Sequence, residues 1–230
     1  MKILRKIEVF GDSILKGIQI NPLNKRYHVN NNIDLDMLNK RFSLNIINHS
    51  KFGCTVTKGK SMLEKYFSGK SDCSAIIMDF GGNDCDFDWK AISENPKDRH
   101  EPNTPIDSFV NVYTNIIEKI KKNGIRPIVT NLPPLEPQRY FDWFSEGLNK
   151  VNLLNWLAGV NTIYRFQEFY SRTVEEISRN TGARLIDLRG KFLKERCIGR
   201  FFCEDGIHPN TEGQKLITQE FTKFFSAAIV

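Results

Sequence analysis

The sequence predicts an α/β fold of three layers, in which helices cover both faces of a five-stranded parallel sheet. Five apolar, β-branched runs recur along the chain, at residues 7–10, 44–48, 75–80, 127–131 and 184–188. The runs are nearly continuous in apolar character, which indicates strands that are buried on both faces. Segments with helical periodicity lie between them, and this alternation favours a three-layer αβα sandwich with right-handed crossovers.

Three helices have the clearest predicted boundaries. The first begins at Thr104, which is expected to form a capping box with Asp107, and it ends before Gly124. The second covers about residues 162–180, where apolar side chains recur at helical spacing. The last follows Asn210, a residue type that is favoured as an N-cap.

We expect one domain over residues 1–230, because a single α/β domain commonly has about 200 to 250 residues. Two segments, near 84–103 and 133–160, are longer than the roughly 2 to 6 residues of simple connections. Both follow the carboxyl ends of predicted strands, where open α/β sheets bind ligands. We expect substrate walls or a lid there; for the second segment, an extra helix packed on the body is an equal alternative.

Composition excludes several classes of protein. The formal charge of +6 and the pI near 9.0 do not predict a nucleic-acid partner, because the basic residues are dispersed along the chain. Five cysteines at irregular spacing indicate neither a zinc site nor a disulfide framework. No run approaches about 18 apolar residues, and the first apolar stretch is shorter than the core of about 7 to 15 residues in a signal peptide. We therefore expect a cytoplasmic protein with no membrane span.

Residues from the two ends of the chain supply a nucleophile, a base and a carboxylate. Ser13 follows a predicted strand, in a turn opened by Gly11 where a hydroxyl can emerge at the edge of the sheet. Asp205 precedes His208 by three residues, in a turn that contains Gly206, so the carboxylate can hold the imidazole in the tautomer that takes a proton from serine. Alone, Ser13 would be read as a helix cap. The combination favours a catalytic triad.

Donors for a developing oxyanion are also present. Asn83 follows two glycines at the end of the third predicted strand, and its side-chain amide can donate to an oxyanion, as can the backbone N–H groups of Gly53 and Ser13. In isolation, the segment around Asn83 would be an ordinary turn. Asp12 and Asp84 are interpreted as turn formers outside the site.

Together these blocks resemble those of the SGNH hydrolases, also called the GDSL esterase/lipase family. That family has a serine in Gly-Asp-Ser, a glycine after the second strand, an asparagine in Gly-x-Asn-Asp and a histidine in Asp-x-x-His-Pro. Here Ser13, Gly53, Asn83 and His208 match in that order, with Asp205 at the carboxylate position. The matching blocks extend over residues 11–210, nearly the whole chain.

The resemblance implies a flavodoxin-like sandwich that hydrolyses carboxylic esters through an acyl-enzyme intermediate, with no metal or other cofactor. It implies that Gly53 and Asn83 complete an oxyanion hole with Ser13. The family's usual leucine after the serine is Ile14 here, a volume-conserving change. The implied partner is a small-molecule ester, most simply a short acyl or acetyl ester such as one on a sugar. An acyltransferase or a non-catalytic carbohydrate-binding descendant on the same scaffold stays open.

Two other chemistries are disfavoured by spacing. Residues 53–61 resemble a phosphate-binding loop, but five residues separate the two glycines where that loop has four. The Gly-x-Ser-x-Gly turn of α/β-hydrolases is absent from the sequence.

Overall fold

The computed structural model describes residues 5–30, 33–69 and 72–228. Its strands are β1 (Arg5–Gly11), β2 (Ile18–Ile20), β3 (Tyr27–Val29), β4 (Leu44–Asn48), β5 (Ala75–Asp79), β6 (Arg126–Thr130) and β7 (Arg184–Ile186). Its helices are α1 (Ser13–Lys16), α2 (Leu35–Phe42), α3 (Val56–Phe67), α4 (Trp89–Glu94), α5 (Ile106–Lys122), α6 (Pro137–Phe144), α7 (Lys150–Leu157), α8 (Asn161–Thr181), α9 (Leu188–Leu193) and α10 (Thr211–Ala228), with a 3-10 turn η1 (Ile198–Phe201).

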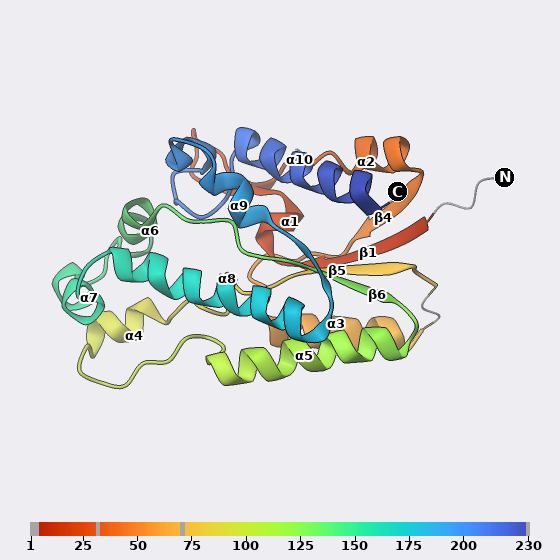
Figure 1. Ribbon diagram of the computed structural model, residues 1–230. Coiled ribbons are helices and arrows are strands. Elements are labelled where there is room, and N and C mark those ends of the chain that lie inside the picture. Colours follow the sequence, from red (N-terminus) through yellow and green to blue (C-terminus); the bar gives the residue numbers. More distant parts are fainter. Residues whose placement is uncertain (1–4, 31–32, 70–71, 229–230) are drawn as a thin grey trace.

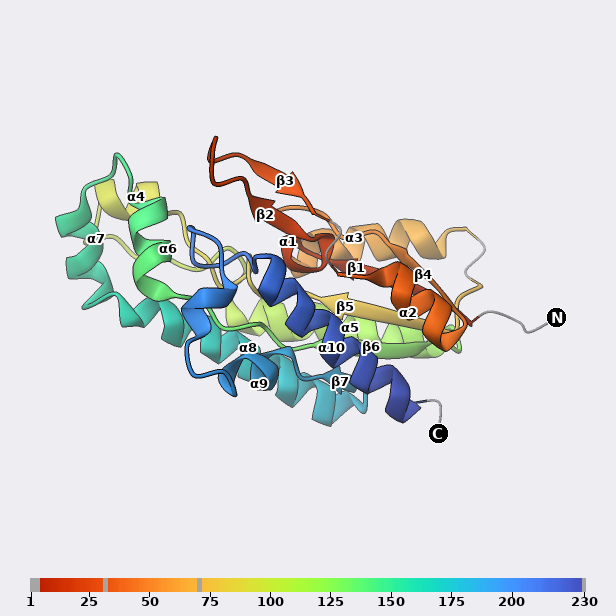
Figure 2. The ribbon, with the colours of Figure 1, turned by 90° about the horizontal axis from the view of Figure 1, so that it is seen from above.

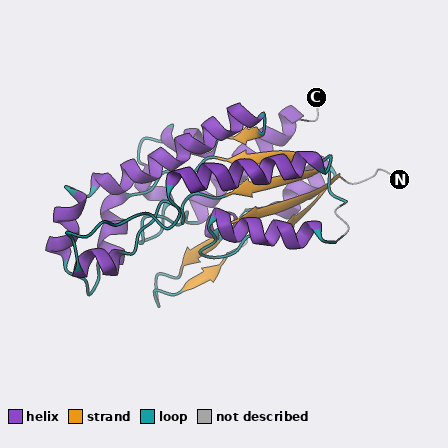
Figure 3. Ribbon diagram, turned by 90° about the horizontal axis from the view of Figure 1, so that it is seen from below, coloured by secondary structure: helices purple, strands orange, loops and turns teal. Residues whose placement is uncertain are grey.

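The central sheet is parallel and has the order β4-β1-β5-β6-β7. Counted along the chain, these are the second, first, third, fourth and fifth strands of the sheet, which is the flavodoxin-like order. The predicted five-stranded parallel sheet between helices is therefore confirmed, and Figure 3 shows the strands enclosed by helices. The order reverses between β1 and β5, the kind of crevice in which open α/β sheets bind ligands.

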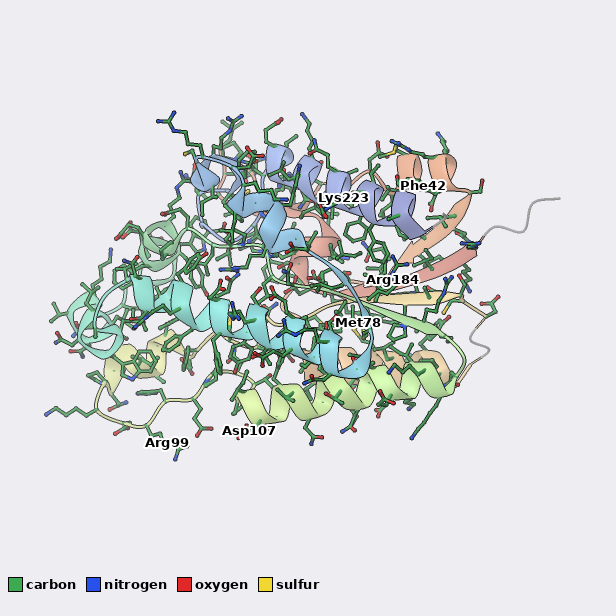
Figure 4. All side chains as sticks on the ribbon, viewed as in Figure 1. Phe42, Met78, Arg99, Asp107, Arg184 and Lys223 are labelled. Carbon is green, nitrogen blue, oxygen red and sulfur yellow. The ribbon has the colours of Figure 1, made fainter. Side chains whose placement is uncertain are left out.

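Helices cover both faces of the sheet. Helices α3, α5 and α8 lie on one face, and α2, α9 and α10 lie on the other (Figure 1). Helix α5 shows why this packing forms, because Phe109, Tyr113 and Ile117 recur on one stripe and are fully buried. Met78 of β5 lies inside the molecule, whereas Arg99 extends from the surface (Figure 4).

The two long segments of the sequence fold into helices at the carboxyl end of the sheet. The first contains α4, and the second contains α6 and α7 (Figure 1). Their apolar side chains form a separate core with the start of α8, which we call the helical lobe; Trp89, Tyr140, Leu153 and Ile163 are among its buried residues. The aromatic rings of Trp89 and Phe144 stack with their centroids 4.2 Å apart. The second segment is thus built of packed helices.

A small antiparallel hairpin of β2 and β3 was not predicted from the sequence. It stands off the central sheet (Figure 2), and each strand has three residues, too few for a periodicity to be read. An ion pair between Lys25 in the hairpin and Glu204 connects it to the loop that carries Asp205. The hairpin therefore lies against the predicted site.

One predicted helix cap is wrong and another is confirmed. Helix α5 begins at Ile106 without a side-chain cap, because Pro105 takes the N-cap position; Thr104 instead donates its backbone N–H to the carbonyl of Asp84 at 3.0 Å. Asn210 does cap α10, since its Oδ1 accepts hydrogen bonds from the backbone N–H groups of Glu212 and Gly213 at 3.0 and 3.1 Å.

Candidate active site

The three residues predicted as a triad lie in one chain of hydrogen bonds. Ser13 is the first residue of α1, directly after β1. Its Oγ lies 2.9 Å from Nε2 of His208, and Nδ1 of the same ring lies 2.5 Å from Oδ2 of Asp205. All three side chains are buried, with Asp205 completely inaccessible. Nucleophile, base and carboxylate therefore have the mutual geometry that acyl transfer requires.

The loop between Asp205 and His208 is shaped by its own residues. Oδ1 of Asp205 accepts hydrogen bonds from the backbone N–H groups of Ile207 and His208 at 3.2 and 3.1 Å, which leaves Oδ2 for the imidazole. Gly206 has a left-handed φ of 74°, and a Cβ at this position would lie 2.5 Å from the carbonyl oxygen of Glu136. The turn thus requires glycine for both its conformation and its contact with the start of α6.

Asn83 lies beside the serine because Asp12 holds it there. Its Nδ2 donates to Oδ2 of Asp12 at 3.0 Å, while Oδ1 of Asp12 caps α1 through the N–H of Ile14 at 2.8 Å. One carboxylate thus connects the turn that carries Ser13 to the predicted oxyanion donor. We interpreted Asp12 from the sequence as a turn former only; its contact with Asn83 joins segments that are far apart in the chain and could not be read there.

Gly53 is placed differently from the other predicted donors. Ser13, Asn83 and His208 line one cavity, whereas Gly53 does not line it. Gly53 has a φ of 65° and follows Phe52, whose ring lies parallel to the His208 ring at 5.8 Å. Within the described part of the chain, its N–H has no hydrogen-bond partner.

Three buried carboxyl groups lie beneath this site. Burial raises the pKa of Asp79 to about 6 and that of Asp84 to about 6. Burial also raises the pKa of Asp12, and the neighbouring charge of Asp79 raises it further. Thr130 donates to Asp79 at 2.5 Å, and Asp84 accepts from the backbone N–H of Val56 at 3.0 Å, so each carboxyl has a partner.

The cavity next to the serine has a volume of about 90 Å³. Its apolar wall includes Trp89, Leu132, Leu135, Tyr140, Ile163 and Phe166, which come mainly from the helical lobe and α8. Asp86 and Gln167 are polar residues in the same wall. An apolar pocket with a few polar groups is the usual form of a small-molecule site.

Aromatic side chains flank the histidine. The Tyr27 ring, on the hairpin, lies edge-on to the His208 ring at 5.2 Å and also contacts Phe52 and Trp143, at 5.1 and 6.1 Å. Its hydroxyl donates to Oδ2 of Asp205 at 3.3 Å. Burial, and then the charge of Asp205, raise the pKa of Tyr27, so the hydroxyl remains a donor. Sequence reasoning missed Tyr27, because no motif marks a single tyrosine in a short hairpin.

Comparison with known families gives an independent reading of the chain. The model of the GDSL-like lipase/acylhydrolase family matches residues 9–216. The chain belongs to this family. As a GDSL-like lipase/acylhydrolase, the protein is a carboxylic ester hydrolase.

Solved structures with the same fold cover nearly the whole of this GDSL-like acylhydrolase. A lipase/acylhydrolase from Enterococcus faecalis is 18% identical, with a TM-score of 0.69, 98% of this chain covered and 97% of the other. An acetylxylan esterase from Geobacillus stearothermophilus, solved as a catalytic mutant, is 16% identical, with a TM-score of 0.68 and coverage of 98% and 96%. A comparison with curated proteins found no match.

Across residues 5–30, 33–69 and 72–228, the GDSL-like acylhydrolase has no group of three or more His, Cys, Asp or Glu side chains that could hold a metal ion. None of the helices that the structure describes is long and apolar enough to cross a membrane.

Proposed function

We propose that this ester hydrolase cleaves short acyl esters, including acetyl esters of sugars, through an acyl-enzyme on Ser13. The observation that carries the proposal is the continuous path of hydrogen bonds from Ser13 through His208 to Asp205, of which Ser13 and His208 line a largely apolar cavity. A buried serine whose only task was to cap a helix would need neither the imidazole nor the carboxylate behind it.

The proposed reaction follows from this geometry. His208 Nε2 takes the proton of Ser13 Oγ as that oxygen attacks the carbonyl carbon of the ester. Collapse of the tetrahedral adduct breaks the bond to the alcohol oxygen, which receives the proton from His208. Water then attacks the acyl-serine by the same route and releases the acid. Asp205 holds the ring and balances the charge of the imidazolium.

Donors for the oxyanion come from three sources in this proposal. The Asn83 amide lines the cavity and is oriented by Asp12, and its longer hydrogen bond, 3.4 Å to the carbonyl of Cys54, is exchanged for one to the oxyanion. The Ser13 N–H lies at the start of a helix, where backbone donors have no partner within the helix. The Gly53 N–H is the third. One such donor typically contributes about 2.7 to 4 kcal/mol to stabilisation of the transition state.

The size of the cavity supports a short acyl group. Its volume of about 90 Å³ is smaller than the roughly 150 Å³ of an engineered apolar cavity that holds benzene. Two observations support an ester of a sugar as the substrate. A structural neighbour is an acetylxylan esterase by name, and the exposed rings of Tyr27 and Phe52 lie beside His208, which protonates the departing alcohol.

A panel of substrates tests the proposal. p-Nitrophenyl esters of increasing chain length and acetylated xylose oligomers are incubated with the protein, and free acid is measured. We expect the highest kcat/KM with acyl chains of two to four carbons, about the length that the cavity admits. Rates that rise steadily with longer chains contradict the assignment of the cavity. Accumulation of acylated sugar in place of free acid identifies a transferase.

Variants test the role of the serine. Ser13→Ala should lower kcat by several orders of magnitude, on the order of a million-fold in an analogous triad. Ser61→Ala, an exposed serine of α3, is the matched control and should leave the rate unchanged. Hydrolysis that survives in Ser13→Ala with normal folding refutes the mechanism.

A further inference from the structure

Asp86 is a carboxylate in the wall of the otherwise mainly apolar cavity. It follows β5 by a short turn and lines the cavity together with Ser13 and His208. The indole Nε1 of Trp89 donates to its Oδ1 at 2.8 Å, and the hydroxyl of Tyr140 donates to its Oδ2 at 2.7 Å. Two helices of the helical lobe, α4 and α6, therefore fix the orientation of the carboxylate.

Asp86 keeps some accessible surface, and its carboxylate keeps some capacity to accept hydrogen bonds. Asp86 is only half-buried, although its neighbours are mainly apolar. A carboxylate has about four acceptor positions, and its donors are Trp89, Tyr140 and the backbone of Phe87. One position therefore remains for a further donor.

Among the residues that the structure describes, no cation neutralises this group. Over the described ranges, the ion pairs of the structure do not include Asp86. Burial raises the pKa of its carboxyl, although the hydrogen bonds from Tyr140, Phe87 and Trp89 act to lower it. A charged group in such surroundings is costly unless it is paired. A cavity that held only hydrocarbon would gain nothing from it, and carboxylates kept in clefts at such a cost are frequently functional.

Two other polar residues of the cavity lining are already engaged. Asp12 is 2% exposed, and its two carboxylate oxygens accept hydrogen bonds from the N–H of Ile14 and from Nδ2 of Asn83. Gln167 accepts a hydrogen bond from the Arg189 guanidinium at 2.8 Å and donates to the carbonyl of Pro133 at 2.6 Å. Arg189 is itself buried and paired with Glu168. Gln167 is therefore held in the wall, and Asp86 is the more exposed of the two carboxylates and offers a charged acceptor to a ligand.

We propose that Asp86 is a specificity-determining residue that accepts a hydrogen bond from a hydroxyl group of the substrate. This inference rests on the proposed esterase function and names the substrate class more closely: hydroxylated esters are preferred to plain ones of the same length. The hydroxyl lies either on the acyl part or on the alcohol part of the ester, and the choice of probes separates these two sources.

The experiment compares matched pairs of esters with the wild-type protein. The acyl pair is p-nitrophenyl butyrate and p-nitrophenyl 3-hydroxybutyrate, and the alcohol pair is propyl acetate and glycerol monoacetate. We expect kcat/KM for the hydroxylated member of one pair to exceed that of the plain member by roughly 10- to 100-fold, the effect of one hydrogen bond to a charged group. The pair that shows the preference identifies the part of the substrate that reaches Asp86.

Variants connect the preference to this carboxylate. Asp86→Asn should bring the ratio of the two kcat/KM values close to one, whatever it does to the absolute rates. Asp88→Asn is the matched control, because it removes a charge two residues away while an asparagine can still cap α4 as Asp88 does. That control should keep the wild-type ratio.

Each result has a distinct meaning. Hydrolysis of plain esters with no preference in either pair overturns the inference and leaves the esterase proposal intact. A preference that persists in Asp86→Asn also overturns it. Loss of thermal stability in Asp86→Asn with an unchanged ratio shows that the carboxylate only connects α4 to α6. Absence of hydrolysis for every ester refutes the esterase proposal, and this inference with it.

Discussion

Replacing Asp79 with asparagine should make the folding stability of the protein less sensitive to rising pH. The carboxyl is 1% exposed, and burial raises its pKa from 3.8 to about 6. Because the folded protein holds this proton more tightly than the unfolded chain, the group favours folding at low pH, and that contribution is lost as the pH rises through about 6. A displacement of about two pKa units, at about 1.4 kcal/mol each, corresponds to roughly 3 kcal/mol by pH 8.

Asparagine at this position cannot ionise, so its contribution to the free energy of unfolding does not change with pH. Relative to wild type, the free energy of unfolding of Asp79→Asn should improve by about 2 kcal/mol between pH 4.5 and pH 8. Removal of the charge also eases ionisation of Asp12, which acts in the same direction. Urea denaturation at both pH values measures the change, with Asp36→Asn on the exposed face of α2 as the control. Parallel curves of stability against pH for wild type and Asp79→Asn refute the reasoning.

Three further variants address the site. Asn83→Ala removes one proposed oxyanion donor and should lower kcat by about 100- to 1,000-fold with little change in KM, measured with p-nitrophenyl acetate; an unchanged kcat excludes the donor role. Gly206→Ala forces a side chain against the carbonyl of Glu136 and should lower the melting temperature by several degrees as well as kcat, as calorimetry and the same assay would show. Tyr27→Phe keeps the ring and loses a 3.3 Å hydrogen bond to Asp205, so kcat should fall by no more than about tenfold, and a much larger loss contradicts a supporting role.

The strands of the central sheet were predictable because strands that are buried on both faces have continuous apolar sequences. Segment 44–48 agrees with β4 at both ends, and the other runs differ from their strands by one or two residues. The hairpin was not predictable in this way. Its strands have three residues each, and its place is fixed by contacts such as Lys25 with Glu204, which join distant parts of the chain.

In the candidate site, too, some contacts could be predicted from the sequence and others could not. Asp205 and His208 are three residues apart, so a turn brings them together and the sequence alone predicts their pairing. Asp86 occurs in the same acidic run as Asp84 and Asp88, and nothing local distinguishes the three. Its environment depends on Tyr140, from a segment more than fifty residues away, and only the folded structure shows that contact.

The helical lobe has its own apolar core, while the serine and the histidine are carried by segments next to the parallel sheet. Much of the apolar wall of the cavity therefore packs separately from the segments that carry Ser13 and His208. A library that varies only Trp89 of α4 and Tyr140 of α6 would reshape this wall while Ser13, His208 and Asp205 keep their identities.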